Sequence, residues 1–99
     1  MHIEFTEPAT IELDDAIEYY ELQLSGLGKK FFTEVIETLE IISKFPQSFT
    51  QNSEHTRKAV LRKFPYNLIY SFLDNKIYII AVAHQNRVPE YWINRASSL

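Results

Sequence analysis

Residues 66–84 read YNLIYSFLDNKIYIIAVAH, and this stretch decides the fold. Two runs rich in Ile, Val, Tyr and Phe lie on either side of Asp74-Asn75, and these residue types favour β-strands. We predict strands over 66–73 and 76–84. The two residues between them predict a tight hairpin turn, although Asn-Gly or Asp-Gly would be a stronger signal.

This turn sets the register of the hairpin by placing Leu73 opposite Lys76. One face of the hairpin then combines aromatic with small or branched residues: Tyr66, Leu68, Tyr70, Phe72, Ile77, Ile79, Ala81 and Ala83. We expect this face to form the core. The other face carries Asn67, Ile69, Ser71, Tyr78, Ile80, Val82 and His84. Because that face is too apolar to be fully solvated, either the loop 47–56 and the C-terminal segment cover it, or a partner does.

Upstream of the hairpin the apolar period is helical. Leu13–Leu24 and Leu27–Ile42 each form an apolar stripe, and the break at 25–28 predicts an antiparallel helical hairpin. We expect the acids off the first stripe, Glu12, Asp15 and Glu18, to face water. A short strand over His2–Thr6 precedes the helices, and a strand over Arg57–Lys63 follows a polar loop over Gln47–Thr56.

The element order is therefore β-α-α-β-β-β, with one or two helical turns over Glu90–Ala96. This order predicts a single α+β domain over residues 1–99, with the helical hairpin on one face of a mostly antiparallel sheet.

Composition limits the function. The 99 residues contain no cysteine, which excludes disulfides and thiolate metal sites, and no run is long enough for a membrane span. The N-terminus lacks the basic start of a secretory signal, so we expect a cytoplasmic protein. Residues 1–40 hold ten acids against two lysines, whereas residues 41–99 hold three acids against eight Lys and Arg. The acidic total argues against nonspecific nucleic-acid binding, but a local anion site is compatible with the basic half.

Candidate chemistry concentrates just beyond the second strand of the hairpin. His84, Arg87, Tyr91, Trp92 and Arg95 fall within a dozen positions, and guanidinium and aromatic groups suit contact with phosphates and bases. His84 could act as a general acid or base near neutral pH. The simpler alternative is a purely structural role, in which His84 caps the edge of a strand, both arginines are solvated and Trp92 fills the rim of the core. The three histidines have no metal-ligand spacing, and nothing indicates a cofactor.

An ordered series of motifs runs along nearly the whole chain: Ala16-Ile17-x-Tyr19-Tyr20-Glu21, Gly26-Leu27-Gly28-x-x-Phe31, Phe45-Pro46, Arg62-x-Phe64-Pro65-Tyr66-x-Leu68-Ile69-Tyr70 and Ala81-Val82-x-His84-x-x-Arg87-x-Pro89-x-Tyr91-Trp92. This series resembles the RelE/ParE superfamily of type II toxins, often labelled plasmid-stabilisation proteins. The predicted element order is also the architecture of that superfamily.

The resemblance implies a small bacterial toxin that a cognate antitoxin neutralises by wrapping around it. RelE-like members cleave mRNA on the ribosome, whereas ParE-like members poison DNA gyrase. A nuclease would use His84, Arg87, Tyr91 and Arg62, and the surface for the target or antitoxin would include Ile69, Tyr78, Ile80, Val82, Trp92 and Arg95. The resemblance leaves open whether the chain forms a homodimer.

Two differences from the sequence pattern of RelE-like nucleases favour a ParE-like toxin. RelE-like nucleases carry an Arg at the position of Asn67 and basic residues near Gln85, and both are lost here. Loss of one cationic donor typically costs ~10²–10³ in rate. We therefore expect a ParE-like toxin that acts through protein contact with DNA gyrase. The alternatives are a ribosome-dependent mRNA endonuclease and a degenerate, non-toxic member that only binds antitoxin.

Overall fold

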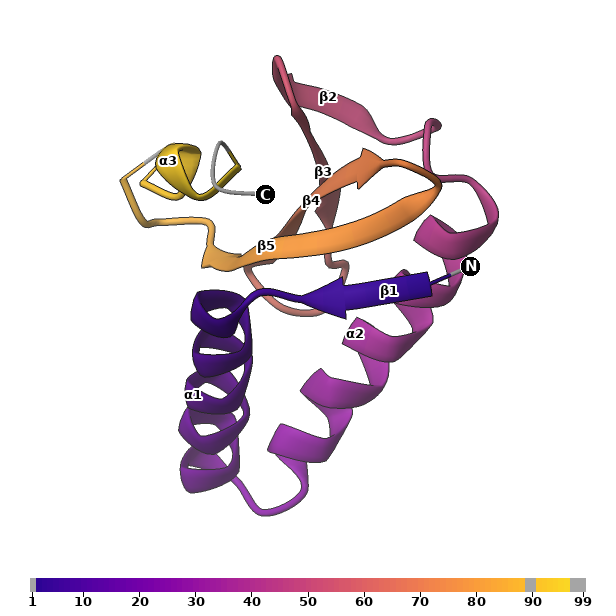
Figure 1. Ribbon diagram of the computed structural model, residues 1–99. Helices are drawn as coiled ribbons and strands as arrows, with labels where there is room; N and C mark the ends of the chain where they lie inside the picture. Colours follow the sequence, from indigo (N-terminus) through magenta and orange to yellow (C-terminus); the bar gives the residue numbers. More distant parts are fainter. Residues whose placement is uncertain (1, 89–90, 97–99) are drawn as a thin grey trace.

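The computed structural model describes residues 2–88 and 91–96 and shows a helical hairpin against one face of a five-stranded sheet (Figure 1). The elements are β1 (His2–Phe5), α1 (Glu7–Gln23), α2 (Leu27–Lys44), β2 (Thr50–Ser53), β3 (Thr56–Val60), β4 (Tyr66–Leu73), β5 (Lys76–His84) and α3 (Ile93–Ala96). The strand order is β1-β5-β4-β3-β2, in which β1 is parallel to β5 and the other pairs are antiparallel. The predicted α+β class is confirmed.

Local sequence explains the ends of the helical hairpin. Thr6 caps α1, because its Oγ1 accepts the N–H of Ala9 at 3.4 Å. Gly26 has φ +90°, a left-handed conformation that favours glycine, and it separates the two helices. The carboxylate of Glu21 accepts the N–H groups of Gly26 and Gly28 and so closes the connection.

Gly28 is required by the contact between the two helices. A Cβ atom at this position would lie 2.6 Å from the backbone oxygen of Ile17, which is far closer than real Cβ contacts. The helices can approach this closely only because the position has no side chain. On the sheet side of the hairpin, Phe31, Val35 and Ile42 are completely buried in the main core.

The β4–β5 hairpin has the predicted turn but only part of the predicted register. Asp74 and Asn75 both have positive φ, as a type I′ turn requires, and pairing follows the prediction from the turn as far as Tyr70 opposite Ile79. A β-bulge then intervenes, because Ile69 lies opposite Ala81 and Ile80 is the extra residue.

The bulge exchanges the faces of the residues that follow it. Ala81 and Ala83, predicted in the main core, lie instead on the opposite, outer face of the sheet together with Ile69 and Ile80. Val82, predicted on that outer face, lies in the main core. The prediction for these three residues was wrong, because alternation along a strand shifts by one residue at a bulge. His84, also predicted on the outer face, likewise turns its ring against Tyr66, which packs on the main core.

Two strand boundaries also differ from the prediction. The segment predicted as a polar loop contains the edge strand β2, which β3 stabilises by antiparallel pairing. β3 ends at Val60 and does not reach Lys63. There the carboxylate of Glu34 on α2, only 8 % exposed, accepts the N–H groups of Arg62 and Lys63, so these groups do not pair with a neighbouring strand.

The chain itself covers the apolar outer face of the sheet. Trp92 is 4 % exposed and packs with Ile69, Ile80, Ala81 and Ala83, while α3 lies on the side of the sheet opposite the helical hairpin (Figure 1). Of the two alternatives raised by the sequence, cover by the chain itself is the one observed, but among the described residues the C-terminal segment alone provides it, because the predicted loop 47–56 instead contributes the edge strand β2. The part of that segment at Pro89 and Glu90 lies outside the described residues. In the described ranges, no helix is both long and apolar enough to span a membrane.

Because of the close contact at Gly28, we expect a substitution that usually stabilises helices to destabilise this protein. Gly→Ala within a helix normally stabilises by about 0.5–1 kcal/mol. We expect Gly28→Ala to destabilise the protein by about 1–3 kcal/mol instead, because the added methyl group would force the helices apart. Urea unfolding followed by circular dichroism measures this. The exposed Thr33→Ala on the same helix is the control, and equal midpoints for the two variants would contradict the contact.

Candidate functional site

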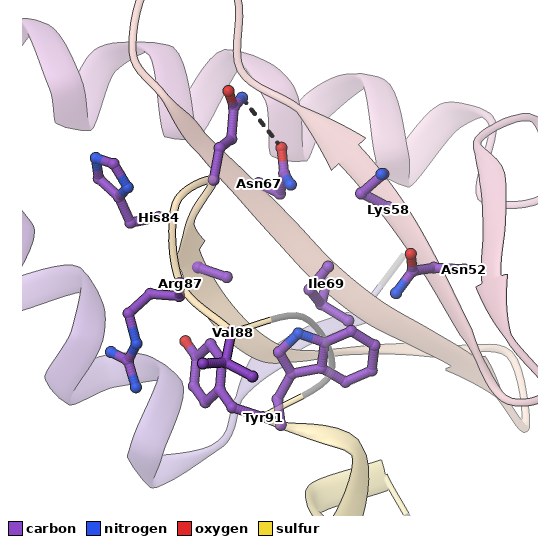
Figure 2. Close-up of a pocket in the computed structure, with 11 residues that line it drawn as sticks. Asn52, Lys58, Asn67, Ile69, His84, Arg87, Val88 and Tyr91 are labelled. Atoms are coloured by element: carbon purple, nitrogen blue, oxygen red, sulfur yellow. Dashed lines mark hydrogen bonds between the residues drawn. The ribbon is translucent and has the colours of Figure 1, made fainter.

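A hollow of about 200 Å³ lies on the outer face of the sheet, beside the end of β5 (Figure 2). We call it the outer hollow. Its walls come from four strands (β2 to β5), the turn after β5 and the C-terminal segment: Asn52, Lys58, Asn67, Ile69, Ala83, His84, Gln85, Arg87, Val88, Tyr91 and Trp92. The sequence pattern placed its candidate residues in this region, and the fold adds contributions from β2 and β3.

The outer hollow is cationic and polar. Lys58 and Arg87 line it together with His84, and none of the described lining residues is a carboxylate. Such a set can bind an anionic group, even though the chain as a whole is acidic. Lys58 was missed by sequence reasoning. It could have been found from the register of β3, because Lys58 lies opposite Ile69 and therefore points to the outer face.

Two amides stand where the RelE pattern has basic residues. The Nε2 of Gln85 donates to the Oδ1 of Asn67 at 3.3 Å, and Figure 2 shows this bond at the edge of the hollow. The pair is neutral, so it supplies no positive charge for a phosphate.

His84 is held by two contacts. Its Nδ1 accepts the N–H of Asn86 at 3.0 Å, and its ring meets the ring of Tyr66 edge to face at 5.0 Å between centroids. Because Nδ1 accepts, the proton of the neutral imidazole lies on Nε2. In Figure 2, His84 and Arg87 lie on one side of the hollow and Lys58 and Asn52 on the other.

Glu12 connects the C-terminal segment to α1 and β5. Its carboxylate accepts from the hydroxyl of Tyr91, from the guanidinium of Arg95 at 3.0 Å and from the N–H of Val82 at 3.0 Å. The prediction that Glu12 faces water was wrong, because its side chain is only 16 % exposed. Glu12 lies beside the apolar stripe of α1, and its carboxylate reaches groups that are distant in the sequence.

Tyr91 is fixed both at its hydroxyl and at its ring. Burial, followed by the hydrogen bond to Glu12, raises the pKa of its phenol. The guanidinium of Arg87 lies 4.2 Å from the ring centroid and that of Arg95 lies 5.1 Å from it, both within cation–π range. The hydroxyl is therefore protonated and engaged at neutral pH, which makes it a poor proton carrier.

A second, larger hollow of about 630 Å³ lies between α1 and the adjoining ends of β4 and β5. We call it the tyrosine hollow, and it is lined by Glu12, Asp15, Ala16, Tyr19, Tyr20, Pro65, Tyr66, Val82, His84 and Arg87. His84 and Arg87 line both hollows. They form the ridge between a cationic hollow and an aromatic, partly acidic one.

The structure gathers three of the four predicted nuclease residues. His84, Arg87 and Tyr91 line the outer hollow, whereas Arg62 lines neither hollow and is exposed where the chain leaves β3. In the described part of the chain, no group of three His, Asp or Glu residues could hold a metal ion.

Most of the predicted binding surface is buried within the chain. Ile80 is completely buried, and Ile69, Val82 and Trp92 are almost so. The other two residues, Tyr78 and Arg95, are half-buried, and Arg95 is bound to Glu12. Among the described residues after β5, the exposed ones are Gln85, Asn86, Arg87, Val88, Ile93 and Asn94, and of these Val88 and Ile93 are apolar.

Comparison with known proteins agrees with this architecture. The fold resembles the chromosomal ParDE toxin–antitoxin system from P. aeruginosa with a TM-score of 0.75, at 18 % identity over 85 % of this chain and 95 % of that one. It also resembles the isolated E. coli RelE toxin with a TM-score of 0.52, at 17 % identity over 99 % of this chain and 98 % of that one. At such low identities these likenesses concern the fold alone. No curated protein sequence matches the chain significantly.

The fold is thus that of the RelE/ParE superfamily of toxins. Within it, the chain belongs to the family of ParE toxins of the type II toxin–antitoxin system parDE, whose family model matches residues 3–89. Membership of this family implies a cognate antitoxin as partner. The family match ends before Tyr91, so the segment that covers the outer face and binds Glu12 lies beyond it.

The contacts of Glu12 predict that its substitution releases the C-terminal segment. In Glu12→Gln, Tyr91 and Arg95 lose the carboxylate, and we expect a loss of stability of about 1–3 kcal/mol, typical of hydrogen bonds to charged groups. Trp92 is the single tryptophan, so its emission should shift to longer wavelength and acrylamide should quench it more strongly. Asp14→Asn, at an exposed position of α1, is the control. Unchanged emission in Glu12→Gln would contradict the role of the carboxylate.

Proposed function

We propose that this chain is a growth-inhibiting toxin that acts in the cytoplasm through protein contact with DNA gyrase and is neutralised by its cognate antitoxin. Membership of the ParE family supports the toxin class. The observation that carries the non-nucleolytic part of the proposal is the state of Tyr91. Its hydroxyl donates to Glu12 and its pKa is raised, so it is unsuited to transfer a proton at neutral pH.

The composition of the outer hollow supports the same reading. Attack by a ribose hydroxyl needs a base, an acid and cations that stabilise the phosphorane. Asn67 and Gln85 provide a neutral amide pair, and Arg62 lies away from the hollow. The outer hollow therefore holds fewer of the acidic, basic and cationic groups that nuclease chemistry needs.

The exposed part of the segment after β5 supports protein contact. Val88 is 73 % exposed and Ile93 is 41 % exposed, and the guanidinium of the exposed Arg87 packs on the Tyr91 ring. Arginine is enriched among the residues that dominate protein–protein binding, and exposed apolar side chains gain free energy when a partner buries them. We propose that this surface, defined by Arg87, Val88 and Ile93, contacts the target.

A ribosome-dependent mRNA endonuclease is the second candidate. It is favoured by one feature, the convergence of Lys58, Arg87 and His84 on a hollow without a described carboxylate. In that mechanism His84 would move the proton and the two cations would hold the phosphate.

A supercoiling assay with purified gyrase tests the proposal. Increasing amounts of the protein should inhibit supercoiling or trap cleaved DNA, and Arg87→Ala should weaken this effect by about tenfold or more if it is a binding hot spot. Lys44→Ala, exposed at the end of α2, is the control and should leave inhibition unchanged.

The mapping of mRNA 5′ ends after induction completes the same experiment. Growth arrest with unchanged 5′ ends is expected. New cleavage sites without any effect on gyrase would establish the nuclease instead. Harmless expression in the absence of antitoxin, with neither activity, would identify a member that only binds antitoxin.

A further inference from the structure

A groove of about 620 Å³ lies beside the connection between α1 and α2, and it shares no lining residue with either hollow. We call it the lysine groove. Leu27 and Phe64 provide its apolar surface, and three lysines, Lys29, Lys30 and Lys63, line it. None of these residues belongs to the site described above.

The lysine groove is positively charged, although the part of the chain around it is acidic. Lys29 and Lys30 are the only basic residues among the first 40, which contain ten acids. The bond between Glu34 and the backbone of Lys63 brings the third lysine to the same place from beyond β3. All three lysines are exposed, and no ion pair involves them within the described ranges.

Folding alone does not account for this arrangement. Lys29 and Lys30 are the third and fourth residues of α2, where a positive charge is unfavourable for the helix dipole, and the first turn contains no acid. The N–H groups of Gly26 and Gly28 are already satisfied by Glu21 and do not bind an external anion. The lysine side chains remain available for an external anion.

We propose that the lysine groove docks an acidic segment of a protein partner that also carries apolar side chains. The ammonium groups would meet its carboxylates, and Leu27, with the 8 % of Phe64 that is exposed, would contact its apolar residues. Of the two lining carboxylates, Glu34 is committed to backbone N–H groups and Glu37 is exposed, so the lysines dominate the charge of the groove.

The charge distribution favours such a segment over a nucleic acid. The two helices beside the groove carry nine of the ten acids of the N-terminal part, which would repel a long polyanion on either side of the three lysines. A short acidic segment needs only these three contacts. This proposal is independent of the identity of the toxin target.

Binding of a fluorescein-labelled peptide made of Glu and Leu, patterned as an amphipathic helix, tests the proposal. Fluorescence anisotropy at low salt should detect binding, and high salt should weaken it. The double variant Lys29→Glu/Lys63→Glu should raise the Kd by about tenfold or more, since two attractive contacts become repulsive. Lys76→Glu lies at the β4–β5 turn outside the groove and should leave the Kd within about twofold.

The variants separate docking from folding. An acid at position 29 suits the helix dipole, so Lys29→Glu should fold as well as the parent, which circular dichroism checks. Failure of the peptide to bind, equal affinities of the double variant and Lys76→Glu, or tighter binding of an oligothymidylate would each overturn the proposal. So would a concentration-dependent dimer that only the double variant abolishes, because the occupant would then be a second copy of the chain.

Discussion

Strand β1 ends at Phe5, while its neighbour β5 continues to His84, so side chains must complete the hydrogen bonding at the free edge of β5. Thr6 and Arg95 both donate to the backbone oxygen of Ile80, and the carboxylate of Glu12 accepts the N–H of Val82. An unpaired strand edge is costly when buried and prone to association when exposed. The same carboxylate binds Tyr91 and Arg95, so one acid completes the sheet and fixes the C-terminal segment.

The bonds of Glu12 to β5 and to the C-terminal segment determine how the candidate site is arranged. With the segment fixed, Trp92 seals the outer face of the sheet, and the Tyr91 ring supports the guanidinium of Arg87. His84 and Arg87 then form a ridge between the cationic outer hollow and the tyrosine hollow. Of the anchoring residues, Tyr91 and Arg95 lie beyond residues 3–89, which match the ParE family model, whereas their partner Glu12 lies within them.

Sequence pattern predicted what depends on local periodicity. The helical hairpin, the turn at Asp74-Asn75 and the first half of the β4–β5 register follow from residue spacing, and the structure confirms them. The bulge at Ile80 could not be predicted, because an extra residue in an apolar run leaves no mark on composition. Glu12 was misjudged because its partners lie about seventy or more positions away. β2 was missed because Thr-Gln-Asn-Ser has little strand preference and depends on pairing with β3.

Amide hydrogen exchange at Val82, followed by NMR, tests this account most directly. The N–H of Val82 bonds to the side chain of Glu12, so its protection reports the bond between α1 and the free edge of β5. We predict that this amide exchanges at least about a hundredfold more slowly than an unstructured amide. Exchange as fast as that of an exposed, unbonded amide would show that the carboxylate does not complete the sheet, and the account of how the C-terminal segment is anchored would fail.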